Sequence, residues 1–125
     1  MIDWNGLPDL VNSDPEFQLA GRFWTATLRL DMGPTSVALR FEEGVLAQVA
    51  DCAPDAESDL YVRAPEPDWQ ELLAPSPRPF YQDLFGAQLH HAVELSPDPL
   101  SYAAYYPALR RLVQLMSAAH GEARV

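Results

Sequence analysis

Apolar and polar side chains alternate along much of the first half of the chain. Every second residue is apolar from Trp24 to Leu30 and again from Val37 to Phe41. Such a period of two is typical of a strand with one buried face. Two turn sequences, Met32-Gly33-Pro34 and Glu43-Gly44, separate these segments from each other and from a third apolar run at 45–49. The pattern predicts a meander of three antiparallel strands.

Two later segments, 59–63 and 88–95, have the same alternation and predict a fourth and a fifth strand. The acidic segment 51–58 precedes the fourth strand and is expected to be a solvated loop. On a fifth strand, consecutive side chains would point to opposite faces. His91 would then face the helices, and His90 would face solvent or a subunit partner.

Helical spacing governs the remaining segments. Ser13-Asp14-Pro15-Glu16 has the spacing of a capping box and predicts a helix at 14–20 that ends at Gly21. A further helix is predicted after the prolines at 65 and 67, because the apolar residues Trp69, Leu72 and Leu73 lie at i, i+3 and i+4. Residues 1–12 have no clear period, which favours an N-terminal arm.

The second half of the chain predicts two more helices. The segment FYQDLFG, residues 80–86, predicts a short helix with an aromatic face that is closed by Gly86. A longer apolar stripe follows Ser96-Pro97 and continues to a stop near Gly121, and Pro107 is expected to kink or split this helix. The stripe consists of Tyr102, Tyr105, Leu109, Leu112, Val113 and Met116.

These elements predict an α+β fold in one domain that spans residues 1–125, with residues 1–12 as its N-terminal arm. Strands with one apolar face must bury it, and each predicted helix offers an apolar stripe to cover it. We therefore expect a two-layer sandwich, in which helices cover one face of a five-stranded, mostly antiparallel sheet.

Charge and cysteine content narrow the partners and the compartment. Eighteen acidic residues outnumber eight basic ones, all arginines, and the net charge of −10 disfavours nucleic acid and anionic membranes. Cys52, the one cysteine, cannot form an internal disulfide, and the N-terminus lacks a signal-peptide pattern. No apolar run approaches the length of a membrane span. The sequence therefore predicts a cytoplasmic protein.

Neither a metal site nor a catalytic site is predicted. The sequence has no His-x-His, Cys-x-x-Cys or His-Glu-x-x-His spacing, no nucleophile elbow and no phosphate loop. Cys52 stands in the acidic segment DCAPDAESD, where neighbouring carboxylates should raise its pKa and suppress thiolate chemistry. We expect no cofactor, no metal and no enzymatic activity.

The large aromatic residues allow two interpretations. Rings at helical spacing usually form plain core. Many rings on three helices and a sheet can also leave gaps lined with carbon, and His91 or a tyrosine could orient a ligand there. The sequence leaves open whether FYQDLFGAQLHH is core or pocket wall.

The order of the predicted elements resembles the sterol carrier protein type 2 family, in its bacterial stand-alone type. The segment DLYVRAPEPDWQELLAP and the stretch from Gly86 to Leu95 that leads into YYPALRRLVQLM carry this resemblance, which spans about Asp14 to Met116. It departs from the family where Ser96-Pro97-Asp98 replaces a Gly-Asp pair. The C-terminus is also not a peroxisomal address.

The resemblance implies a cavity between sheet and helices for a fatty acid, an acyl ester or a sterol-like molecule. Phosphate recognition of coenzyme A would depend on arginines alone, which lowers the odds of that ligand. A homodimer or an enzyme partner is a further candidate assembly. The candidate ligand-binding residues are Trp24, Leu28, Phe41, Trp69, Leu73, Phe80, Phe85, Leu89, His91, Val93, Tyr102, Tyr105, Leu109 and Met116.

Two alternatives to a lipid carrier stay open at this point. The chain could be an interaction module with a filled core that docks on an enzyme through Tyr106, Arg110 and Arg111 or through the His90 face. It could also be a small enzyme that uses His91 and a tyrosine as acid and base.

Overall fold

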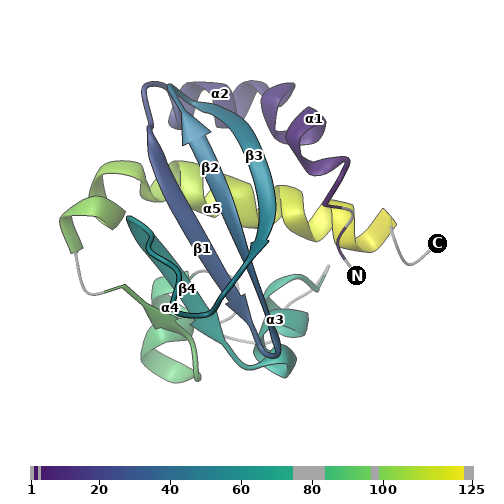
Figure 1. The fold of residues 1–125 in the computed structure, drawn as a ribbon, viewed down its shortest axis with the longest axis vertical. Coiled ribbons are helices and arrows are strands. Elements are labelled where there is room, and N and C mark those ends of the chain that lie inside the picture. Colours follow the sequence, from purple (N-terminus) through teal and green to yellow (C-terminus); the bar gives the residue numbers. More distant parts are fainter. Residues whose placement is uncertain (1, 3, 75–83, 97–98, 123–125) are drawn as a thin grey trace.

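The computed structural model describes residues 2, 4–74, 84–96 and 99–122, with side chains for all of these except 85, 89, 90, 99–104 and 120–122. In this part of the chain, a mixed sheet lies against helices (Figure 1). The elements in chain order are α1 (Leu7–Asn12), α2 (Pro15–Ala20), β1 (Ala26–Met32), β2 (Thr35–Glu42), β3 (Val45–Cys52), β4 (Leu60–Ala64), α3 (Glu66–Leu72), α4 (Leu84–His90), β5 (Glu94–Leu95) and α5 (Pro99–Glu122).

The described strands form one sheet in the order β3-β2-β1-β4-β5. The meander β1–β2–β3 is antiparallel, β5 is antiparallel to β4, and β4 is parallel to β1. The long helix α5 crosses behind this sheet (Figure 1). The predicted α+β class and the five-stranded, mostly antiparallel sheet are confirmed. Because β3 is an edge strand and β4 pairs with β1, the connection 53–59 must pass across the sheet.

Both turns of the meander use backbone conformations that favour glycine. Gly33 has a φ of +73°, and a Cβ there would lie 3.0 Å from Cβ of Glu66. At the second turn, Glu43 and Gly44 both have positive φ, as the twist of a tight hairpin requires. A Cβ on Gly44 would lie 2.8 Å from the carbonyl oxygen of Gly21. The two turns therefore fix the register of the sheet and also pack against neighbouring segments.

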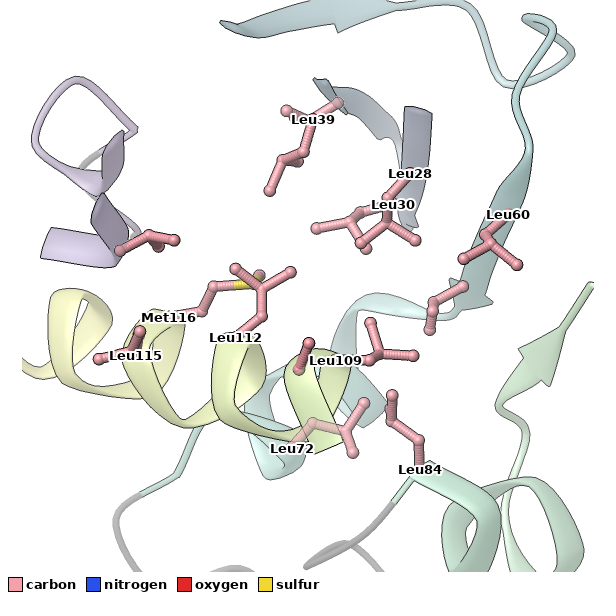
Figure 2. Packing of buried hydrophobic residues seen from close by; sticks show 14 of the residues in the cluster. Leu28, Leu30, Leu39, Leu60, Leu72, Leu84, Leu109, Leu112, Leu115 and Met116 are labelled. Atoms are coloured by element: carbon pink, nitrogen blue, oxygen red, sulfur yellow. The ribbon is translucent and has the colours of Figure 1, made fainter. Parts of the chain in front are cut away.

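The centre of the interface between sheet and α5 is filled by aliphatic side chains. Figure 2 shows Leu109, Leu112 and Met116 of α5 opposite Leu28, Leu30 and Leu39 of β1 and β2. None of these six side chains is more than 2% exposed. Burial of this apolar surface is the main force that joins the two layers. Any space for a ligand must therefore lie away from this centre.

The N-terminal segment, for which the sequence suggested an arm without a clear period, contains a short helix. Residues 7–12 form α1, and both Leu7 and Val11 are fully buried. Asn12 then hydrogen-bonds both backbone groups of Leu46, since its Nδ2 donates to the carbonyl at 3.1 Å and its Oδ1 accepts from the amide at 2.8 Å. A helix of six residues is too short to produce a clear period, which explains why the pattern missed it.

The predicted helix at 14–20 is confirmed, but its cap is different. Asp14, and not Ser13, is the N-cap residue of α2, and its Oδ2 accepts from the Phe17 amide at 2.8 Å. The Ser13 hydroxyl instead donates to the carbonyl of Asp9 at the end of α1. Ser13 therefore caps the end of α1, and Asp14 caps the start of α2. The capping-box pattern alone could not show which of these two adjacent residues is the N-cap.

The predicted fifth strand at 88–95 is wrong over most of its length. Helix α4 runs from Leu84 to His90, and the amide of His91 still donates to the carbonyl of Ala87 at 2.8 Å. Only Glu94 and Leu95 pair with β4. Gly86 lies inside α4 and does not end it, although glycine in a helix costs about 1 kcal/mol relative to alanine. Leu84 and Ala87 bury one face of the helix, so tertiary packing outweighs both the glycine and the alternation that follows it.

Helix α5 confirms the predicted break near Pro107. Tyr105 has non-helical dihedrals, with φ −126° and ψ 19°, two residues before the proline. Proline has no amide hydrogen to donate, and its ring crowds the preceding turn, which bends the helix there.

Candidate functional site

A pocket of about 540 Å³ lies beside the β1–β2 turn. It is formed by three segments: the N-terminal residues before α1, the turn end of the sheet, and α3. The described residues that line it are Ile2, Trp4, Met32, Pro34, Thr35, Val37, Asp51, Glu66, Gln70 and Leu73. Its size falls within the range of about 300–1,000 Å³ that is usual for small-molecule sites.

The deep part of this pocket is apolar and its outer part is polar. Ile2, Val37 and Leu73 are 6%, 4% and 3% exposed, whereas Thr35 and Asp51 at the rim are exposed. The deep side chains have no hydrogen-bonding group, so apolar burial would dominate the binding of a ligand there. The arrangement suits a molecule with an apolar body and one polar end.

Strand register brings the sheet residues of the pocket together. Met32 lies opposite Thr35 in the β1–β2 pair, and Val37 lies opposite Asp51 in the β2–β3 pair. Residues opposite each other in a sheet point to the same face. The hairpin and the end of β3 therefore contribute four side chains to one side of the sheet.

Helix α3 is held against this end of the sheet by specific hydrogen bonds. The indole Nε1 of Trp69 donates to the carbonyl of Asp31 at 2.8 Å, and the ring is 2% exposed. The Ser117 hydroxyl of α5 donates to the Leu73 carbonyl at 2.7 Å, just after α3 ends. These contacts place Gln70 and Leu73 at the pocket.

The charged groups of the pocket all have one sign. Among the described residues that line it, only Asp51 and Glu66 carry a charge, and both are carboxylates. The remaining polar side chains, Thr35 and Gln70, are neutral and can donate or accept hydrogen bonds.

Two arginines lie instead on the opposite face of the sheet, around Asp31. The Arg29 Nε is 3.0 Å from Asp31 Oδ1, the Arg63 Nε is 3.1 Å from Asp31 Oδ2, and the Ser36 hydroxyl donates to Asp31 at 2.8 Å. Arg29 also donates to the carbonyl of Ala56 at 2.7 Å. This cluster attaches the crossing segment 53–59 to the sheet.

Cys52 lies near the same cluster. Burial raises the pKa of the Cys52 thiol, and the negative charge of Asp31 raises it further. The sequence also predicted a raised pKa for this thiol. It attributed the increase to neighbouring carboxylates, whereas burial is the larger cause. A thiol with a raised pKa is a weak nucleophile at neutral pH.

Of the candidate ligand-binding residues, three come together in a ring stack far from the pocket along the sheet. Trp24 stacks on Phe41 at 4.4 Å between centroids and on Tyr105 at 5.5 Å. Phe17 extends the group by a contact with Phe41 at 5.7 Å. These rings pack α2 and the bend of α5 onto the start of β1.

The other candidates are distributed between the core, the pocket and undescribed positions. Leu28, Leu109, Met116, Trp69 and Val93 belong to the buried core, and Leu73 lines the pocket. His91 is half-buried directly after α4. Phe80 lies outside the described residues, and so do the side chains of Phe85, Leu89 and Tyr102.

Most pocket residues were not among the sequence candidates. The sequence did reveal the turn and strand patterns that contain Met32, Pro34 and Val37. Alternation of apolar and polar residues, however, cannot show that a pocket lies at the end of the sheet. Ile2 and Trp4 were assigned to an arm. Their apolar character next to a buried helix was the signal that could have included them.

Titratable side chains do not cluster in a metal-like arrangement in the described part of the chain. No group of three or more His, Cys, Asp or Glu side chains there could hold a metal ion. A second, smaller pocket of about 280 Å³ lies beside Tyr106, Arg110 and Arg111. Arg111 at this edge is engaged by Asp14 at 2.7 Å and by Glu16 at 2.8 Å.

Solved structures with the same architecture reveal the fold class of this arrangement. A crystal structure of sterol carrier protein 2 matches with a TM-score of 0.78 and 21% sequence identity, over 95% of this chain and 97% of the other. The chain has the sterol carrier protein 2 fold. The resemblance inferred from the sequence is thus confirmed at the level of fold.

Two further structures share the sterol carrier protein 2 fold with this chain. One is a conserved hypothetical protein of Thermus thermophilus, described as possibly a sterol carrier protein, with a TM-score of 0.69 and 20% identity over 91% of this chain and 83% of the other. The second is a UbiJ-SCP2 ubiquinone synthesis protein, with a TM-score of 0.60 and 19% identity over 91% of this chain and 87% of the other. No protein-family model matches the sequence, and no curated protein is significantly similar to it.

A helix that crosses a membrane must be long and predominantly apolar. No helix in the described part of the chain combines the length and the apolar character needed to cross a membrane.

Proposed function

We propose that this protein binds and carries a hydrophobic small molecule in the pocket beside the β1–β2 turn, without catalysing a reaction on it. The observation that carries the proposal is a pocket of about 540 Å³ whose deep side chains, Ile2, Val37 and Leu73, are apolar. The sterol carrier protein 2 fold supports the same ligand class. A cytoplasmic location fits the single free cysteine, because a reducing compartment preserves thiols.

Trp4 provides a direct readout of binding. It lines the pocket and is half-buried, whereas Trp24 and Trp69 are each only 2% exposed. A long-chain alcohol that enters the pocket should therefore change the fluorescence of Trp4 more than that of the other two. The Trp4→Phe variant should lose this signal while it still binds the alcohol in calorimetry.

A bulky side chain at the rim should block the pocket. Thr35 is exposed and lines it, so Thr35→Trp can fill the opening without disturbing the core. We expect dodecanol binding to weaken by roughly tenfold or more, since most of the apolar contact would be lost. Isothermal titration calorimetry measures this loss.

A matched control adds the same ring elsewhere on the sheet. Gln48 is exposed on β3 and pairs with Arg40, which places it on the face opposite Asp51. Gln48→Trp should bind dodecanol as the original protein does. If Thr35→Trp and Gln48→Trp bind equally well, the pocket is not the site.

The filled centre of the interface supports a second candidate, an interaction module that docks on an enzyme or on a second copy of the chain. Phe23 favours it, because this side chain is 73% exposed and the backbone has a φ of +72°. A bulky residue with positive φ is strained, and strain of this kind concentrates at functional sites. This candidate would gain support if dodecanol failed to bind and a stoichiometric complex formed only with Phe23 intact.

A further inference from the structure

The rim of the pocket carries two carboxylates that no described cation balances at the site. Asp51 lies one residue before the end of β3 and Glu66 begins α3, so they approach the opening from two different elements. Both are exposed, and both line the pocket. A ligand whose apolar body fills the deep part would present its polar end to this rim.

Described arginines that could balance these charges are engaged elsewhere. Arg29 and Arg63 pair with Asp31 on the opposite face of the sheet, and Arg111 pairs with Asp14. No described arginine lines the pocket, and the sequence contains no lysine. An anionic end would therefore meet like charges at this rim without compensation from a described arginine.

The start of α3 does not reverse this sign. Helix N-termini attract anions, but Glu66 and Asp68 already place two carboxylates in the first turn of this helix. The neutral groups Thr35 and Gln70 can bond to any polar end and do not select between charges. Selection by charge is left to Asp51 and Glu66.

We infer that the ligand of this pocket has a polar end that donates hydrogen bonds and carries no negative charge, as a long-chain alcohol does. This inference rests on the proposed function and narrows its ligand class away from ionised fatty acids and phosphate esters. A hydroxyl can donate to a carboxylate, and such charge-assisted hydrogen bonds are stronger than neutral ones. An ionised carboxylate at the same place has no proton to donate and is repelled by both rim carboxylates.

Dodecanol and dodecanoate form a matched pair of probes, because they differ in the polar end alone. At neutral pH and about 0.15 M salt, charges beyond a screening length of ~8 Å contribute little, so the comparison reports the charges near the ligand. We expect the original protein to bind dodecanol roughly tenfold or more tightly than dodecanoate, a ratio that like-charge repulsion at the rim readily supplies. Calorimetric titration gives both affinities.

Two double variants separate local from overall charge. Asp51→Asn with Glu66→Gln removes the rim charges and should bring the two affinities together. Asp55→Asn with Glu57→Gln changes the net charge equally in the exposed crossing segment and should leave the ratio unchanged. All four positions are exposed, so both proteins should fold, which their circular dichroism checks.

The outcomes distinguish this inference from the proposed function. If the original protein binds neither probe, the proposed function itself fails. If it binds both equally, or if the rim variant keeps the original ratio, the pocket function stands and the inference about the polar end is wrong. If the control variant equalises the affinities as strongly as the rim variant does, net charge sets the preference, and the inference is again overturned.

Discussion

Asp31 carries its charge where little water reaches it. Its side chain is 6% exposed and that of its partner Arg29 is 7% exposed. Its carboxylate also accepts a hydrogen bond from the Ser36 hydroxyl and pairs with Arg63, so the two oxygens have three partners. Removing one member of a buried charge pair leaves the other without compensation, which costs more than the pair contributes.

We therefore predict that Asp31→Asn lowers the free energy of unfolding by about 3–5 kcal/mol. The matched control is Glu94→Gln, which removes another partner of Arg63. Glu94 is 56% exposed and lies 3.4 Å from the guanidinium, so its loss should cost about 1 kcal/mol or less. Urea denaturation measures both values, and equal losses would show that Asp31 is not electrostatically isolated from water.

Single side chains were only partly predictable from the sequence. The apolar spacing around Trp69 predicted a buried face, but the bond from its indole to the Asp31 carbonyl depends on how α3 meets the end of β1. The alternation in β1 predicted that Arg29 and Asp31 share the polar face. It could not predict their burial, because the cover comes from the segment 53–59.

At the scale of elements, an ion pair between Asp14 and Arg111 links the start of α2 to α5 across 97 positions of the sequence, and Glu16 is a second partner of Arg111. Asp14 caps α2 and also accepts two hydrogen bonds from Arg111, at 2.7 and 2.9 Å. The hydrogen bond with Arg111 is the largest cause of the low pKa of Asp14, which falls from 3.8 to about 2. The link is therefore present only while Asp14 is ionised.

The pKa of Asp14 predicts a definite pH dependence. A carboxyl whose folded pKa is below its unfolded value stabilises the fold above the unfolded pKa and loses this effect as pH falls through the folded one. The stability gap between the original protein and Asp14→Asn should be complete at about pH 5 and should shrink between pH 3.8 and about 2. Asparagine keeps an N-cap acceptor, so the variant removes the charge and one of the two oxygens that accept from Arg111.

Unfolding curves at stepped pH values measure this gap. An Arg111→Gln background provides the control, because Asp14→Asn should produce a smaller and flatter gap once its partner is gone. A gap that persists unchanged to the lowest pH would contradict the link.

Elements with a strong, long pattern were predicted well, and short or ambiguous ones were not. The meander β1–β2–β3 and the bend of α5 follow from alternation and from Pro107. The stretch from Leu89 to Leu95 satisfied the strand pattern and still begins as helix, because Leu84 and Ala87 bury the face of α4. Packing of α4 against the core outweighs the local alternation here, and the alternation contains no information about that packing.

At the scale of the whole molecule, the sequence predicted the layers and left open whether a cavity lies between them. The centre is packed by Leu112 and Met116, each fully buried, and the described pocket lies at the turn end of the sheet. That space exists where Trp4, the β1–β2 turn and α3 meet without closing on one another. A pocket between three segments depends on how these segments pack against one another. The hydrophobic period of any single segment therefore cannot predict the pocket.

A pocket of fixed volume limits the length of the chain that it can enclose. Each buried methylene contributes about 0.8 kcal/mol, which is about a fourfold gain in affinity. Along the series from octanol to hexadecanol, we expect affinity for the protein to rise by this factor per methylene until the pocket is full. Beyond that length, added methylenes stay in water and contribute nothing.

Titration of Trp4 fluorescence measures the whole series, and calorimetry with Trp4→Phe checks that the reporter does not bias it. The shape of the curve distinguishes an enclosed site from adsorption on an exposed apolar surface. Adsorption would add a similar increment for every methylene, with no plateau, because an open surface sets no limit on length. A plateau that starts at a shorter alcohol when the pocket is narrowed by Val37→Phe would assign the limit to this pocket, since Val37 lies in its deep part and is 4% exposed.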